Sequence, residues 1–100
     1  MTIHLTNENG TVCLKPEGWL DTVTSSELGA AIDTIEAAQT LILDFEKVEY
    51  MSSAGLREVV SANSKAKALN ADFRVINVVP AVMNIFKMTG IDNKLDIRAL

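Results

Sequence analysis

Residues 41–45, LILDF, are the feature that most limits what this chain can fold into. The apolar run is short and nearly continuous, and it lacks the 3.6-residue polarity of a surface helix. Such a run is typical of a central β-strand covered on both faces, and strands of this kind are usually parallel. Parallel strands need crossover connections, so the sequence around this strand has to supply helices.

Helical patterns stand on both sides of this strand. In residues 22–38, Thr24 precedes Glu27 by three positions, which is the spacing of a capping box, and an apolar face follows it. Residues 54–69 carry a second apolar face with lysines near its C-terminal end, and Asn70 is the predicted cap. We therefore expect two helices that cover the predicted strand.

The two ends of the chain complete the pattern. IHL and TVCLK flank the turn-forming NENG near the start, which predicts an antiparallel ribbon. Residues 73–79 predict another strand, Pro80 to Gly90 a helix, and KLDIR a last edge strand. The predicted class is α/β, with a mixed and mostly parallel sheet, an N-terminal antiparallel strand, right-handed crossovers and helices packed against the sheet.

Composition narrows the function classes. The chain has 100 residues, of which 48% are hydrophobic, so we expect one domain over residues 1–100. The net charge is −4 and no block of Lys or Arg occurs, which argues against nucleic-acid binding. Cys13 is the only cysteine, and there is no Cys/His cluster, so we expect neither a disulfide nor a metal or other cofactor. The sequence shows neither a signal peptide nor an apolar run long enough to span a membrane. We therefore expect a cytoplasmic protein that does not insert into a membrane.

The stretch YMSSAGLRE, residues 50–58, places two serines between a predicted strand and a predicted helix. A serine just before Ala54 would be the N-cap, and Ser53 could serve only that structural purpose. It could instead be a phosphoacceptor, because free N–H groups and the helix macrodipole would stabilise an added dianion. In that case Gly55 would let the backbone of another molecule approach. The residues alone leave both interpretations open.

Three segments together resemble a STAS domain, and specifically a single-domain anti-sigma factor antagonist of the bacterial partner-switching type. These are EGWLD (17–21), LILDFEKVEYMSSAGLREV (41–59) and VPAVMNIFKMTGIDNKLDI (79–97). Their order and separation carry the resemblance. It places Ser53 at the position that the family phosphorylates, with Ser52 as the second candidate. Ser52 stands where many members have aspartate, and Ala54 where many have a second serine or threonine.

The resemblance implies a partner-switching function. The protein would bind an ATPase-fold anti-sigma factor that is also a serine kinase, phosphorylation of Ser53 would break the contact, and a PP2C-like phosphatase would restore it. The expected partner-binding residues are Gly18, Trp19, Asp21, Ser52, Ser53, Ala54, Gly55 and Arg57. For Asp21 a turn cap is an equal alternative, and for Trp19 partly buried packing is the commoner one.

Enzymatic activity is not expected. The sequence contains no Ser/His/carboxylate set, P-loop, dinucleotide fingerprint or metal-ligand spacing. Asp44 is expected to bond loop amides. Two alternatives stay within the binding classes: an accessory subunit of a transport or stress-sensing assembly in which the serine is structural, and a nucleotide-binding role suggested for the wider family.

Overall fold

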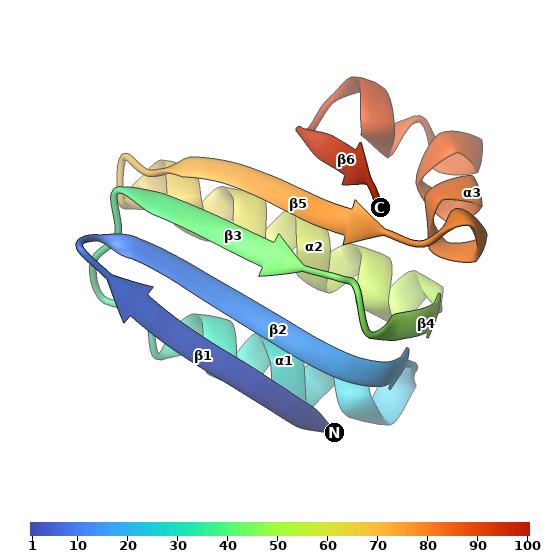
Figure 1. The fold of residues 1–100 in the computed structure, drawn as a ribbon, viewed down its shortest axis with the longest axis horizontal. Coiled ribbons are helices and arrows are strands. Elements are labelled where there is room, and N and C mark those ends of the chain that lie inside the picture. The colour runs from blue at the N-terminus through green and yellow to red at the C-terminus, as the bar shows by residue number, and fades with distance from the viewer.

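The computed structural model describes residues 1–100, which form one six-stranded sheet and three α-helices (Figure 1). The strands are β1 (Thr2–Glu8), β2 (Thr11–Leu20), β3 (Thr40–Asp44), β4 (Val48–Met51), β5 (Asp72–Val78) and β6 (Ile97–Ala99). The helices are α1 (Thr22–Asp33), α2 (Ser53–Ala68) and α3 (Pro80–Thr89), followed by the short 3-10 helix η1 (Ile91–Asn93). The predicted α/β class and the order of its strands and helices are confirmed, with β4 as an addition.

The sheet is mixed, as predicted. Its main order is β1-β2-β3-β5-β6, and only β1 and β2 are antiparallel. The long strand β2 has two successive partners on one side: residues 11–14 pair with β3, and residues 18–20 pair with β4. Strand β4 was not predicted. Its two buried residues, Val48 and Met51, enclose two exposed ones, so the segment lacks the alternation that identifies a half-buried strand.

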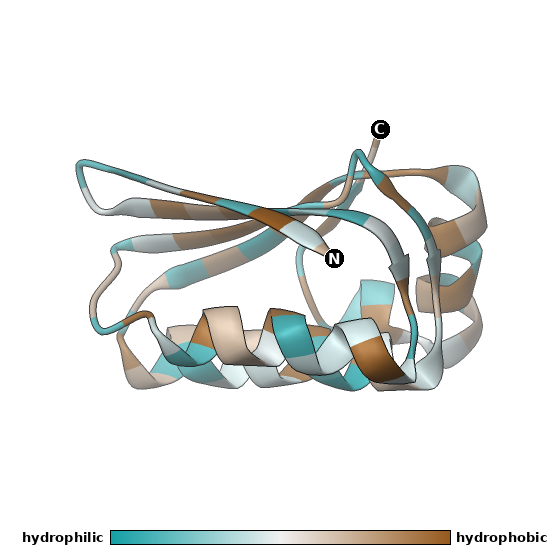
Figure 2. Ribbon diagram, turned by 90° about the horizontal axis from the view of Figure 1, so that it is seen from below, coloured by the Kyte–Doolittle hydropathy of each residue, from teal (hydrophilic) through white to brown (hydrophobic).

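The helices cover one face of the sheet only. Figure 2 shows α1 and α2 together below the sheet, with no element on the opposite face. In β3, Leu41 and Leu43 point to the helices and are fully buried, whereas Ile42 between them is only partly covered. The expectation that residues 41–45 are covered on both faces is therefore wrong. An apolar residue at position 42, on the open face, made the run look continuous.

The hydrophobic core lies between the sheet and the helices. Its fully buried members include Leu14, Leu20, Leu41, Leu43 and Val75 from the sheet, with Leu28, Val59, Ala62, Ala66 and Phe86 from the helices. Phe45, just after β3, stacks on Phe86 of α3 with ring centroids 6.4 Å apart, which fixes α3 against the end of the sheet. No helix is both long enough and apolar enough to cross a membrane.

The predicted C-terminal caps of the second and third helices are correct, whereas the predicted N-cap of the first helix is wrong. Pro80 is the first residue of α3, and Gly90 ends it in the left-handed conformation, as predicted. Asn70 also has positive φ directly after the C-terminal end of α2. The cap predicted for the first helix is wrong: Asp21 is the N-cap of α1, and Thr24 is the third helical residue. The side chains of Asp21 and Thr24 form the capping box that had been assigned to Thr24 and Glu27.

Candidate functional site

The candidate site lies where β2 and β4 end and the helices α1 and α2 begin. Parallel strands end at the same edge of a sheet, so the residues that follow them are neighbours. The N–H of Ser52 donates to the C=O of Leu20 at 2.8 Å, which joins the end of β4 to the end of β2. The two helices then run side by side along the same face of the sheet. Asp21 and Ser53, far apart in the sequence, therefore lie at the same end of the molecule.

Ser53 is the first residue of α2, and it is exposed. The expectation that it is the N-cap is wrong, because Ser52 has the extended backbone of the N-cap (φ −86°, ψ 178°). The Ser52 Oγ is shielded from solvent and has no hydrogen-bond partner. Of the two candidate hydroxyls, the structure thus presents the one on Ser53 to solvent and covers the one on Ser52.

The N-terminus of α2 has no side-chain cap. Its first intrahelical hydrogen bond is donated by the Leu56 N–H to the Ser52 C=O, at 3.0 Å. The preceding helical amides, from Ser53 to Gly55, therefore have no intrahelical acceptor, and no acidic residue lies in the first turn. Positive partial charge collects at this end, and an anion placed here would be stabilised.

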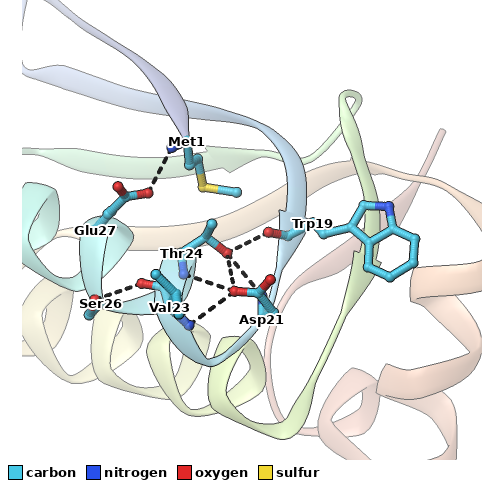
Figure 3. Close-up of polar contacts among 7 residues, drawn as sticks. All are labelled: Met1, Trp19, Asp21, Val23, Thr24, Ser26 and Glu27. Carbon is cyan, nitrogen blue, oxygen red and sulfur yellow. Dashed lines mark hydrogen bonds and ion pairs between the residues drawn. The ribbon is translucent and has the colours of Figure 1, made fainter.

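The N-terminus of α1 is built differently (Figure 3). Asp21 Oδ1 accepts from the backbone N–H groups of Val23 and Thr24 at 3.0 and 2.9 Å. These hydrogen bonds, the one from the Thr24 N–H first among them, lower the pKa of the Asp21 carboxyl. The Thr24 hydroxyl accepts from the Asp21 N–H and donates to the Trp19 C=O. Of the two interpretations of Asp21, the cap is thus observed.

An exposed aromatic pair stands beside this cap. Trp19 of β2 and Tyr50 of β4 pair in register, with ring centroids 5.2 Å apart, and their exposed fractions are 57% and 43%. Figure 3 shows the indole pointing away from the Asp21–Thr24 hydrogen bonds. Trp19 is thus more exposed than covered, although its ring lies beside that of Tyr50. Sequence reasoning missed Tyr50, because its position opposite Trp19 depends on β4.

The remaining predicted site residues fall into two groups. Gly18 and Ala54 are partly exposed. Arg57 is exposed and has no ion pair, and it lies one helical turn beyond Ser53. Gly18 has φ +105°, which favours glycine, and it adjoins the irregular register between β2 and β4. Gly55 is different, because it is buried: a Cβ there would lie 2.7 Å from Met51 Cγ and 2.9 Å from Leu20 Cβ. The predicted approach of another backbone at Gly55 is replaced by close packing within the protein.

Other candidate groups do not join this site. Asp44 Oδ1 accepts from the Glu46 N–H and the Asn77 side-chain amide, both at 3.1 Å, as predicted for a loop-bonding carboxylate. Partial burial raises the pKa of the Cys13 thiol, which disfavours the reactive thiolate. The single histidine, His4, contacts Glu17 at 2.7 Å on the exposed part of the β1–β2 ribbon.

Comparison with known proteins places the chain in context. The profile of the STAS domain matches residues 2–99. An anti-sigma factor antagonist from Mycobacterium paratuberculosis has a similar structure, with a TM-score of 0.89, 24% identity, and coverage of 99% of this chain and 86% of that one. An anti-sigma-factor antagonist (STAS) domain protein from Planctomyces limnophilus gives 0.77 at 19% identity, covering 98% and 90%. The phosphorylated form of the Bacillus cell fate determinant SpoIIAA gives 0.74 at 23% identity, covering 96% and 90%. At these identities the structural likeness establishes the fold.

Proposed function

The chain belongs to the STAS domain family, and from this premise we propose that it is an anti-sigma factor antagonist switched by phosphorylation of Ser53. The unphosphorylated protein binds an anti-sigma factor that is also an ATPase-fold serine kinase. This binding releases the sigma factor, or another regulated protein, from the anti-sigma factor. The kinase transfers the γ-phosphoryl group of ATP to Ser53, which ends the contact. A PP2C-like phosphatase hydrolyses the phosphoserine and restores binding, and the cycle takes place in the cytoplasm.

The observation that carries this proposal is the difference between the two neighbouring hydroxyls. Ser53 is exposed at a helix N-terminus that no side chain caps, whereas the Ser52 Oγ is covered. A kinase can reach the first hydroxyl without unfolding the helix. The product is then stabilised, because a phosphoryl group near the free first-turn amides meets the positive end of the macrodipole. Ser53 is therefore the proposed acceptor, ahead of Ser52.

The surface around Ser53 suits a contact that charge can switch. The aromatic pair Trp19 and Tyr50, the Asp21 turn and Arg57 lie at or beside the helix N-termini, and aromatic and Arg residues are common anchors in protein interfaces. Phosphorylation adds about −1.5 to −2 charges at neutral pH. A charge buried or opposed at a desolvated contact costs about 2–5 kcal/mol, which is enough to dissociate the complex.

The structure favours binding over catalysis. Ser53 would need an adjacent base to act as a nucleophile, and the only histidine is engaged with Glu17 on the β1–β2 ribbon. No group of three His, Cys, Asp or Glu side chains is arranged to hold a metal ion. In the proposed cycle the chemistry is done to this protein by its kinase and phosphatase.

Phosphopeptide mapping tests the proposal directly. The protein is incubated with MgATP and each ATPase-fold serine kinase encoded by its host, and the phosphate is located by mass spectrometry. We expect one phosphate on Ser53, absent from Ser53→Ala and retained in Ser52→Ala. Phosphate on Ser52 would shift the switch by one residue. An unmodified loop, under conditions in which another antagonist of the host is phosphorylated, would overturn the proposal in favour of an accessory-subunit role.

A further inference from the structure

The outer edge of β1 is the longest unpaired strand edge of the sheet. β1 is the first strand in the sheet order, and its only partner is β2. The pairing runs without a shift from Thr2 opposite Glu17 to Glu8 opposite Thr11. The backbone groups that point away from β2 therefore form a regular row of donors and acceptors, which is a template for another strand.

This edge lacks the features that usually protect an edge strand. The β1 sequence, TIHLTNE, contains no proline, lysine or arginine, and its register with β2 contains no bulge. At the other end of the sheet, β6 has only three residues, and its register with β5 shifts between Val75 and Val78. Short length and irregularity blunt that edge. The β6 edge is therefore short and irregular, whereas the β1 edge is long and regular.

A side chain on β1 points to the same conclusion. Leu5 lies opposite Leu14 of β2, on the face of the sheet that carries the helices, yet 48% of it is exposed. A cavity of about 300 Å³ flanks it, lined also by Val12 of β2 and by residues 34–37. The segment that follows α1, residues 34–37, lines this cavity and does not fill it. An apolar side chain is left beside an open strand edge, on the one face of the sheet that is otherwise buried.

We propose that β1 pairs antiparallel with β1 of a second copy, about a two-fold axis perpendicular to the sheet. This symmetry makes the interface isologous and keeps the helices of both copies on the same side, so residues of the same face meet. Near the centre of β1, Leu5 then lies opposite either Leu5 or Ile3 of the second copy. Both registers give an apolar pair, and neither places Glu8 opposite Glu8.

The charges of the strand agree with self-pairing. Glu8 is the only acidic residue of β1, and it stands at the end of the strand, so the antiparallel arrangement separates the two copies of Glu8 by nearly the whole strand length. His4 is occupied by Glu17 of its own copy. The dimer leaves Ser53 untouched, since Ser53 follows β4, which lies on the opposite side of β2 from β1 (Figure 1). Self-association is therefore independent of the proposed switch, and either can fail alone.

Sedimentation velocity on the full chain tests this pairing at about 5 to 500 µM, a range that covers the weak association expected of a small interface. We expect the weight-average mass to rise from 10.9 kDa towards twice that value. Leu5→Lys, which places a charge at the edge, should weaken association by about tenfold or more. Val60→Lys is the matched control, because Val60 is 41% exposed on α2, away from β1, and its mass curve should follow the unmodified protein.

Two results would overturn the proposal. The first is a mass that stays at the monomer value throughout this range. The second is association that persists equally in Leu5→Lys, which would place the interface elsewhere. Circular dichroism on both variants shows whether they are folded. Amide hydrogen exchange supplies the second readout: protection of β1 should grow with concentration in the unmodified protein and in Val60→Lys, but not in Leu5→Lys.

Discussion

The two adjacent serines at the N-terminus of α2 differ in their surroundings. Ser52 occupies the N-cap position of α2 without capping it, and its Oγ has no partner. Asp21 shows the alternative within the same molecule, since its carboxylate accepts two first-turn N–H groups of α1. The chain thus leaves the N-terminus of α2 without an internal anion while supplying one to α1.

This difference predicts a stabilising substitution. Ser52→Asp should allow a carboxylate to accept from the first-turn amides of α2 and raise the free energy of unfolding by about 1 kcal/mol. Urea unfolding measures it. Ser64→Asp, an exposed change of the same charge further along α2, is the control and should bring no gain. Equal effects of the two substitutions would show that α2 gains nothing from a cap.

The sequence located this site to within one residue and no better. Serine is a preferred cap, and both positions 52 and 53 hold serine, so composition could not choose between them. Helix boundaries are uncertain by about one or two residues on any assignment. The choice is made by the hydrogen bond between Ser52 and Leu20, which connects segments more than thirty positions apart. No local pattern contains that information.

At the scale of elements, Gly55 decides how closely α2 approaches the ends of β2 and β4. A Cβ at Gly55 would lie 2.7 Å from Met51 Cγ, 2.9 Å from Leu20 Cβ and 3.1 Å from the Leu20 carbonyl oxygen. Two of these atoms belong to well-packed core positions, and the third is backbone. The helix therefore has to move if any side chain is added here.

Gly55→Ala should lower the free energy of unfolding by about 1–3 kcal/mol through overpacking. Gly29→Ala is the matched comparison, because its Cβ would meet only the Glu58 carboxylate, at 2.7 Å, and that end of a flexible side chain can move away. Alanine's higher helix propensity should then stabilise α1 by up to about 1 kcal/mol. Thermal or urea unfolding of both variants measures the sign of each change in the free energy of unfolding. The same sign for both would contradict this account of α2 packing.

The elements that the sequence predicted are those with a local period. The α1 and α2 faces, the β1–β2 ribbon and the Pro80-to-Gly90 helix were identified from spacing and end signals. Strand β4 was not, because its register with β2 shifts at Gly18 and Trp19 and leaves two exposed residues between its buried ones. Because β4 was not predicted, the position of Tyr50 beside Trp19 was not predicted either. The open face of the sheet was also missed, since Ile42 is apolar on the uncovered side.

In the whole molecule, the helices α1 and α2 cover only one face of the sheet, and this arrangement determines where the candidate site forms. With α1 and α2 on one face, the turns from β2 into α1 and from β4 into α2 come together at one end of the sheet (Figure 1). That end holds Ser53, the Asp21 cap and the aromatic pair. The open face carries ion pairs such as Lys15 with Glu46, at 2.9 Å, which suit a solvated surface. This end of the sheet is where we propose that partner binding and modification take place.

The most direct test of this account is the affinity of the host's ATPase-fold anti-sigma kinase for the protein with and without phosphate on Ser53, measured by isothermal titration calorimetry. The unphosphorylated protein and Ser53→Ala should bind equally well. Phosphorylation should weaken binding at least about thirtyfold, which corresponds to the lower bound of about 2 kcal/mol for a charge at a desolvated contact. Ser53→Asp should weaken binding in the same direction. Equal affinities of the phosphorylated and unphosphorylated proteins would contradict the switch.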